Sequence, residues 1–190
     1  MSQLNTPMSD EKPVVAVTGA SRGIGHAIVK EFHSAGWEVL TLARTPFSKV
    51  CPWAEGIVKH IEVDLASESS IMEACSTLKA RLGNNGLSAL VNNAGISPKD
   101  ADGGRLSAMK TSFDTWHAVQ MVNLTGPLLL CQQLLQPLPQ AKGANEHVTS
   151  IAATHIHPFA GAAYAVSKAG LSALTRELAF ELAESGVRVN

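Results

Sequence analysis

The sequence predicts an α/β fold in which one parallel sheet is wound with helices on both faces. Short apolar segments alternate with segments of helical periodicity along the whole chain, and this alternation is typical of doubly wound parallel sheets. The length of 190 residues suits a single domain. The composition, 45% hydrophobic and 16% charged, favours a compact chain that buries a core over a disordered one.

Composition and charge exclude several classes of function. The formal net charge of −1 gives no electrostatic reason to expect nucleic acid. The three cysteines, Cys51, Cys75 and Cys131, form no C-x-x-C pair, so neither a disulfide framework nor a zinc site is indicated. No apolar run reaches the roughly 18 residues of a membrane span. Met1 to Lys12 shows no targeting pattern and is predicted to be a flexible tail, so we expect a cytoplasmic protein with one domain over 13–190.

The first half of the chain predicts three strands and two helices. Val14–Val17 is a continuous apolar run, as in strands buried on both faces. Ile24 to Ala35 carries apolar residues at helical spacing and stops at a glycine. Further strands are predicted over Val39–Ala43 and His60–Val63. Ser67 is a suitable N-cap for the helix that follows.

The second half predicts three more strands, over Leu87–Asn92, Val148–Ser150 and Val187–Val189. Thr111–Asp114 has the form of a capping box and should begin a long helix. The last helix is predicted from Ala162 to Glu184, where leucines recur on one face. Ligands of such sheets bind outside the carboxyl ends of the strands, so functional residues are expected there.

A glycine-rich turn, Thr18 to Gly25, follows the first strand and leads into a helix. Glycines allow a sharp turn and a close approach to a ligand, and a helix N-terminus favours an anion, so a pyrophosphate is the expected guest. A turn without a ligand is the alternative, because the spacing is G-x-x-x-G-x-G and not the common G-x-G-x-x-G.

The second strand ends in Leu-Ala-Arg44-Thr and has no acid that would hold a ribose 2′-hydroxyl. Arg44, joined by Arg22 of the glycine turn, is instead suited to a 2′-phosphate, which favours NADP over NAD. The alternative is that Arg44 is a solvated loop charge, as most surface arginines are. The fourth strand ends in Asn92-Asn-Ala-Gly95, which indicates either a wall of the adenosine pocket or an ordinary Asx turn.

Tyr164 and Lys168 stand four residues apart on one face of the last predicted helix. A cation beside a phenol favours the phenolate, which equips Tyr164 for proton transfer; the alternative is a tyrosine packed under a lysine stem. Ser150, at the end of the fifth predicted strand, is positioned either to bond a substrate carbonyl or to cap a turn. His155 and His157 are interpreted as loop residues near the substrate entrance, since no carboxylate or cysteine stands nearby to complete a metal site.

Taken together, these motifs resemble the short-chain dehydrogenase/reductase family, in the family's order and near its spacing. The matching segments are TGASRGIG (18–25), DL (64–65), NNAG (92–95), VNLTG (122–126), TSIA (149–152), YAVSK (164–168) and VRVN (187–190). The resemblance implies a Rossmann-type sheet and an NAD(P)-dependent oxidoreductase. It also implies that a Pro-Gly motif, a substrate lid and a final edge strand follow the last of these segments, and the 190 residues do not include them.

The resemblance also implies residue roles. Tyr164 is similar to the family's catalytic acid/base, Lys168 to the lysine that assists it and binds the nicotinamide ribose, Ser150 to the serine that orients the substrate carbonyl, and Asn123 to the asparagine of a proton relay. Ser150 and Tyr164 would contact substrate. The residues expected to bind cofactor are Gly19, Ser21, Arg22, Ile24, Gly25, Arg44, Asp64, Leu65, Asn92, Ala94, Gly95, Tyr164 and Lys168.

The predicted function is therefore NADP(H)-dependent reduction of a ketone or aldehyde, or oxidation of the alcohol, with a 3-oxoacyl thioester as one candidate substrate. A catalytically silent NADPH-binding or regulatory protein is the alternative, because the lid segment is missing. A nucleotide-sugar epimerase or dehydratase shares Tyr-x-x-x-Lys but is disfavoured by the glycine spacing. The family resemblance further implies a homodimer or homotetramer, with Ala165, Ala169 and Ala173 allowing close approach of a partner helix.

Overall fold

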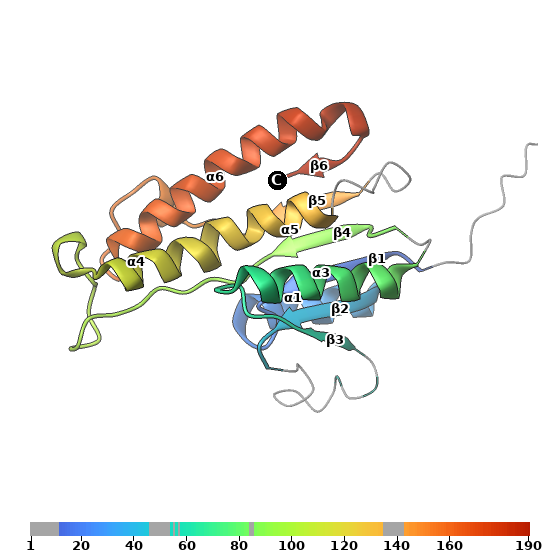
Figure 1. The fold of residues 1–190 in the computed structure, drawn as a ribbon, viewed down its shortest axis with the longest axis horizontal. Helices are drawn as coiled ribbons and strands as arrows, with labels where there is room; N and C mark the ends of the chain where they lie inside the picture. The colour runs from blue at the N-terminus through green and yellow to red at the C-terminus, as the bar shows by residue number, and fades with distance from the viewer. Residues whose placement is uncertain (1–11, 46–53, 55, 57, 84–85, 135–142) are drawn as a thin grey trace, which may run out of the picture.

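The computed structural model describes residues 12–45, 54, 56, 58–83, 86–134 and 143–190, so the predicted tail lies almost wholly outside the described residues. Six parallel strands form one sheet in the order β3-β2-β1-β4-β5-β6 (Figure 1). The strands are β1 (Val14–Thr18), β2 (Glu38–Ala43), β3 (Lys59–Glu62), β4 (Ala89–Asn92), β5 (Ala144–His147) and β6 (Arg188–Val189). The doubly wound α/β fold predicted from the sequence is confirmed.

Helices cover both faces of the sheet. The helices are α1 (Gly23–Ser34), α3 (Glu68–Leu82), α4 (Phe113–Gln120), α5 (Gly126–Leu134) and α6 (Ala162–Leu182). In Figure 1, α3, α5 and α6 lie in front of the sheet and α1 lies behind it. Among the described residues, no helix is both long enough and apolar enough to cross a membrane.

The core is divided by the sheet into two apolar clusters, because successive side chains of a strand point to opposite faces. On β1, Val14 and Ala16 belong to the cluster that α3, α5 and α6 cover. Val15 and Val17 belong to the other cluster, beneath α1. All four side chains are buried, which explains why the strand reads as a continuous apolar run.

Two predicted helix starts can be compared with the structure. Ser67 caps α3 as predicted, since its Oγ accepts a hydrogen bond from the Ser70 amide at 3.3 Å. For α4 the predicted capping box is wrong by one residue. Ser112 is the cap and accepts from the Thr115 amide, whereas the Thr111 hydroxyl donates back to the Ser107 carbonyl.

The long helix predicted after this cap is interrupted. Met121–Thr125 forms a π-helical turn between α4 and α5, in which the Gly126 amide bonds to the Met121 carbonyl. Asn123 lies in this turn and is fully buried. Such turns occur inside α-helices and are frequent at functional sites.

The fifth strand was predicted in the wrong place. It runs over Ala144–His147 instead of Val148–Ser150, and it pairs with β4 in the register Asn92 opposite His147. The prediction failed because Asn145 and His147 point inward and bond to each other, so this buried strand is not apolar. Glu146 points to the opposite face, where its carboxylate accepts from Asn190 at 3.1 Å.

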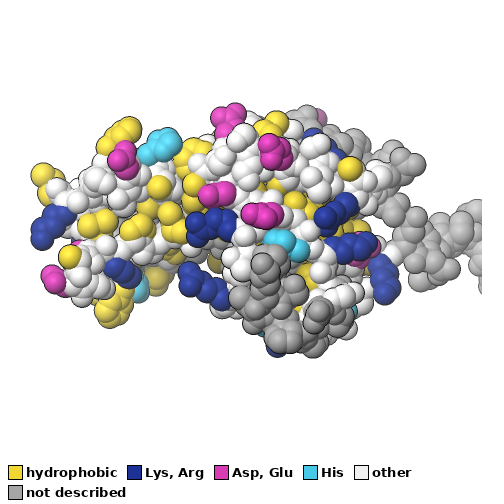
Figure 2. Space-filling view, turned by 60° about the horizontal axis from the view of Figure 1, so that its bottom comes forward, with side chains coloured by type: hydrophobic (Ala, Val, Ile, Leu, Met, Phe, Trp, Pro, Cys, Tyr) yellow, Lys and Arg dark blue, Asp and Glu magenta, His cyan; other side chains and the backbone are white. Residues whose placement is uncertain are grey.

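The surface carries charges of both signs. On the face drawn in Figure 2, basic and acidic side chains are interspersed and do not separate into patches of one sign. Apolar side chains are exposed at the end of the molecule where Figure 1 places α4 and the start of α6. Met109, Phe113 and Ile156 are 95%, 78% and 91% exposed.

Candidate active site

The glycine turn after β1 packs against the turn after β4. Gly19 has a positive φ of +65°, and a Cβ atom there would lie 2.7 Å from the Ala94 Cα. A Cβ on Gly25 would lie 2.4 Å from both the Asn93 Nδ2 and the Gly19 carbonyl oxygen. These distances are too short for any side chain, so the sequence pattern reflects a real steric requirement.

The first turn of α1, which follows these glycines, has no side-chain cap. The N-cap residue is Arg22, whose side chain makes no capping hydrogen bond, and no acidic residue stands in the first turn. By contrast, Ser67 and Ser112 cap α3 and α4. The uncapped amides and the positive end of the helix dipole make this terminus suitable for an anionic group.

Thr18 and Asn93 tie the two turns together. The Thr18 hydroxyl donates to the Val91 carbonyl and accepts from the amides of Asn93 and Ala94, both at 3.0 Å. The Asn93 side-chain amide donates to the carbonyls of Thr18 and Gly19, each at 3.1 Å. Asn93 was not among the predicted site residues, although its position beside Asn92 and before Ala-Gly was the available signal.

Other predicted cofactor residues lie along the same edge of the sheet. Arg22 and Arg44 are exposed and follow β1 and β2, which are neighbours with Thr18 opposite Leu42. Ser21 is half-buried, whereas Ile24 is 63% exposed despite its apolar side chain.

Two other predicted residues, Leu65 and Asn92, do not present their side chains to this edge, and a third, Asp64, uses its side chain within its own turn. Leu65 is buried in the core cluster beneath α3 and α5. The Asp64 carboxylate accepts from the Ala66 amide at 2.9 Å and so shapes its own turn. Asn92 points into the interior, 1% exposed, toward Asn145. Any contact of Leu65 or Asn92 with a ligand at the edge would come from main-chain atoms.

Asn92 begins a buried chain of hydrogen bonds that runs from β4 to α6. Its Nδ2 donates to the Asn145 Oδ1 at 3.0 Å, and the Asn145 Nδ2 lies 3.1 Å from the His147 Nε2. The Thr175 hydroxyl donates to the Leu171 carbonyl and therefore accepts from the His147 Nδ1 at 2.8 Å. These bonds place the imidazole proton on Nδ1, and they fix α6 against the end of β5.

Burial controls the protonation of the groups in this network. Desolvation, and secondarily the charge of Lys168, lowers the pKa of His147 to about 4, so the imidazole is neutral near pH 7. The neighbouring Cys131 thiol accepts from Asn145 at 3.2 Å, and burial raises its pKa to about 12. A neutral imidazole and a protonated thiol indicate a structural role for this cluster. No group of three potential metal-ligating side chains occurs in the part of the chain that the structure describes.

Asn123, in the π-turn, connects the turn after β4 to α6. Its Oδ1 accepts from the Ile96 amide at 2.8 Å, and its Nδ2 donates to the Ile96 carbonyl and to the Ser167 hydroxyl. Ser167 in turn donates to the Tyr164 carbonyl at 2.7 Å. Because both atoms of the amide are engaged, the side chain of Asn123 positions its neighbours.

Lys168 is buried beside Tyr164. Its Nζ donates to the Val148 carbonyl at 2.6 Å and lies 6.0 Å from the centre of the Tyr164 ring. A Cβ on Gly95 would lie 3.7 Å from this Nζ, so the ammonium is close to the NNAG turn. Burial lowers the pKa of Lys168 to about 8.

We expect this burial to appear in the pH dependence of stability. The pKa of Lys168 is about 8 in the folded chain and 10.5 in the unfolded one, so the unfolded state holds more protons between these values. The free energy of unfolding of the wild type should therefore rise relative to a Lys168→Met variant between pH 8 and 10.5, by about 1–3 kcal/mol. Urea denaturation at several pH values measures the difference, with Lys110→Met as the exposed control. If the free energies of unfolding of wild type and Lys168→Met changed in parallel with pH, the lowered pKa of Lys168 would be contradicted.

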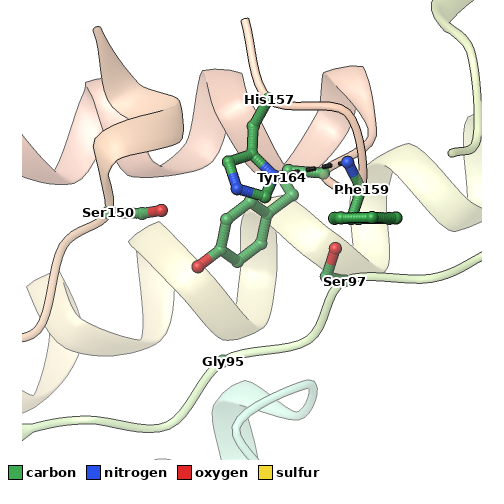
Figure 3. Close-up of a pocket in the computed structure, with 7 residues that line it drawn as sticks. Gly95, Ser97, Ser150, His157, Phe159 and Tyr164 are labelled. Atoms are coloured by element: carbon green, nitrogen blue, oxygen red, sulfur yellow. Dashed lines mark hydrogen bonds between the residues drawn. The ribbon is translucent and has the colours of Figure 1, made fainter. Parts of the chain in front are cut away.

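Tyr164 and Ser150 line one pocket of about 340 Å³, shown in Figure 3. The Ser150 Oγ accepts from the Ala152 amide at 3.2 Å, which leaves its own hydrogen free to donate into the pocket. The predicted turn-capping role of Ser150 therefore coexists with its place in the pocket. The lining residues are Gly95, Ser97, Ser150, His157, Phe159, Ala160 and Tyr164. Ser97, Phe159 and Ala160 were not predicted, since they belong to loops without a recognisable pattern.

The family model described as short chain dehydrogenase matches residues 13–190 of the chain. The protein FixR of Bradyrhizobium diazoefficiens is 50% identical over 181 residues, which cover 95% of this chain and 65% of FixR. The chain thus spans just under two thirds of the length of that relative. The 3-oxoacyl-[acyl-carrier-protein] reductase FabG of Aquifex aeolicus is 35% identical over 189 residues, which cover 93% of this chain and 71% of FabG.

Solved structures agree with this similarity. An oxidoreductase of the short chain dehydrogenase/reductase family from Brucella ovis, in complex with a partially ordered NAD, superposes with a TM-score of 0.89 at 48% identity. That match covers 95% of this chain and 82% of the other. A metagenomic short-chain oxidoreductase in complex with NADP superposes with a TM-score of 0.81 at 31% identity, covering 94% and 79% of the two chains.

Proposed function

The chain belongs to the short-chain dehydrogenase/reductase family, and on that premise we propose that it is an NADP(H)-dependent oxidoreductase of a ketone or aldehyde and the corresponding alcohol. The observation that carries the proposal is one pocket that both Tyr164 and Ser150 line, with their side chains on the same side of it in Figure 3. The buried Lys168 ammonium lies beside Tyr164. This combination suits proton transfer to a polarised carbonyl oxygen.

The residues at the sheet edge fit a nicotinamide dinucleotide. The uncapped start of α1 is suited to the pyrophosphate, and the space that side chains on Gly19 and Gly25 would fill allows close contact with the main chain. When bound, the cofactor supplies or accepts a hydride. Lys168 would bind its nicotinamide ribose, and the turns that contain Asp64 and Ala94 would border its adenosine half.

The chain's own residues would then act as follows. Ser150 donates a hydrogen bond that orients the carbonyl, and Tyr164 delivers the proton to the oxygen as the carbon is reduced. Lys168 favours the phenolate that remains. Asn123 bonds to the turn after β4 and, through Ser167, to the start of α6. It therefore fixes the position of Gly95 relative to Tyr164. We propose that Asn123 also takes part in a proton relay, as the asparagine at the similar position of the family does.

Preference for NADP over NAD is the finer part of the proposal. It rests on the exposed Arg22 and Arg44, which follow the adjacent strands β1 and β2 at the edge of the sheet proposed to bind cofactor. It rests also on the absence of an acidic residue at the end of β2. Guanidinium groups suit a 2′-phosphate, whereas an acid would suit the 2′-hydroxyl of NAD.

The test is oxidation of NADPH and of NADH, followed by the absorbance of the reduced nicotinamide, with a panel of ketones and aldehydes that includes a 3-oxoacyl thioester. We expect turnover with NADPH and a lower KM for NADPH than for NADH. NADPH binding without turnover of any carbonyl would instead support the catalytically silent alternative. Absence of cofactor binding would overturn both.

An Arg44→Ala variant tests the cofactor preference directly. Removal of a charged hydrogen bond to the 2′-phosphate should raise the KM for NADPH about 10- to 100-fold and change that for NADH about twofold or less. The exposed Arg176, on α6, provides the control variant Arg176→Ala. An equal effect of Arg44→Ala on both cofactors would show that Arg44 does not contact the 2′-phosphate.

The same proposal extends to assembly and location. We propose a homodimer or homotetramer in the cytoplasm, with partner contacts on the outer face of α6. The exposure of Val166 and Phe180, 49% and 84%, supports an interface there. Nucleic acid and membranes are not proposed as partners.

A further inference from the structure

The loop between Ser150 and Tyr164 is held in place by the segment that follows β4. Lys99 donates from its Nζ to the Phe159 carbonyl, and the Arg105 Nε donates to the Ala160 carbonyl at 2.8 Å. The Ala162 amide donates to the Leu106 carbonyl. A Cβ on Gly161 would lie only 2.8 Å from that carbonyl oxygen, so the two segments are in close main-chain contact. The part of the pocket wall at Phe159 to Ala162 is therefore held by the segment 99–106.

His157 stands on this wall with a defined tautomer. Its Nδ1 accepts a hydrogen bond from the Phe159 amide at 3.3 Å, so in the neutral ring the proton lies on Nε2. Figure 3 shows this bond as a dashed line and shows the other ring nitrogen on the side of Ser150 and the Tyr164 hydroxyl. The imidazole thus offers one N–H donor to the pocket.

The pocket holds more hydrogen-bond donors at this end than a simple ketone can use. A carbonyl oxygen has two lone pairs, and the proposed reaction assigns them to the hydroxyls of Ser150 and Tyr164. The Ser97 hydroxyl lies beside Phe159 in Figure 3, whereas the His157 Nε2–H is a further donor on the side of Ser150 and Tyr164. No carboxylate stands among the seven residues that line the pocket. A donor left without a partner when substrate displaces water costs binding free energy.

We propose that His157 determines substrate preference by donating a hydrogen bond to a second oxygen of the substrate. The substrate class is a dicarbonyl compound, meaning a 2-oxo or 3-oxo acid, ester or thioester, whose second carbonyl oxygen lies near the reacting one. The Phe159 ring and Ala160 provide an apolar wall for the rest of the molecule. This inference rests on the proposed function, because it takes Ser150 and Tyr164 as the groups that bind the reacting carbonyl.

The test compares two substrates of equal chain length, ethyl acetoacetate and 2-heptanone, with NADPH. In a His157→Leu variant the ratio of their kcat/KM values should fall about 10- to 100-fold, because only the ester uses the lost donor. His157→Gln, which keeps an N–H donor, should recover part of the ratio. His155→Leu is the matched control, since His155 lies in the same loop, is exposed and does not line the pocket.

An unchanged ratio in His157→Leu, or the same change in His155→Leu, would overturn the inference. A second readout does not depend on turnover. Quenching of NADPH fluorescence by ethyl 3-hydroxybutyrate and by 2-heptanol measures the affinity for the two alcohols, and His157→Leu should weaken only the first. If the wild type binds these alcohols but reduces neither ketone, the proposed function fails while the binding data still decide the role of His157.

Discussion

A Tyr164→Phe variant is expected to lose turnover by about 10²- to 10⁴-fold. The substitution removes one oxygen atom from the pocket and leaves the ring, which is half-buried between α6 and the loop carrying His157. Without the hydroxyl, the proposed mechanism loses the acid that delivers a proton to the carbonyl oxygen as its carbon is reduced. The measurement is kcat for NADPH oxidation at saturating ketone.

Binding and folding should be preserved in the same variant. Lys168 keeps its bond to the Val148 carbonyl, so the affinity for NADPH should change about threefold or less. Since the hydroxyl is the only group lost, the free energy of unfolding should change by about 1 kcal/mol or less. A kcat close to that of the wild type would remove Tyr164 from the proposed mechanism. A large loss of cofactor affinity would assign it a binding role instead.

The second large effect is expected from Gly19→Ala, which should abolish detectable NADPH binding and destabilise the fold. Alanine at a φ of +65° costs about 1–2 kcal/mol, and its Cβ would lie 2.7 Å from the Ala94 Cα. The atom it meets is main chain and cannot rotate away. The turns after β1 and β4 must then separate, which breaks the bonds that Thr18 and Asn93 make between them.

Gly36→Ala separates these two causes. Gly36 has a φ of +84°, but a Cβ there would meet no atom within 4 Å. We expect Gly36→Ala to lower the free energy of unfolding by about 1–2 kcal/mol and to leave NADPH binding intact. Gly19→Ala should lose an additional 1–3 kcal/mol or so from the steric overlap. Equal stability of the two variants, measured by urea denaturation, would show that the two turns adapt without cost.

The fold was predictable because its signals are local. The apolar run at β1 predicts a buried strand and the periodicity of α6 predicts a helix, and each pattern lies within the element itself. The fifth strand was not predictable, because the burial of Asn145 and His147 depends on partners as distant in sequence as Asn92 and Thr175. A polar segment signals a buried strand only when its partners are known.

In the candidate site, too, some features follow from local sequence patterns and others do not. Motif residues such as Gly19 and Lys168 lie where the pattern predicted, because main-chain geometry and helical spacing fix them. The direction of a side chain at the end of a strand follows from its register, so Asn92 points inward. Leu65 lies three residues beyond β3, and its burial comes from packing in the core cluster. His157 was expected only near the entrance. Its tautomer comes from a bond within its own loop, which no sequence pattern encodes.

The π-turn at Met121–Thr125 allows the two halves of one continuous helix, α4 and α5, to pack against different helices. Before the turn α4 packs against α6, and after it α5 packs against α3. An α-helix advances about 100° per residue, so the additional residue in the wider turn rotates the following surface by roughly that angle. The π-turn thus rotates the contact surface of α5 relative to that of α4, and Asn123 lies within this turn. Its length is consequently more tightly constrained than its composition, because gaining or losing a residue there would turn one helix away from its neighbour.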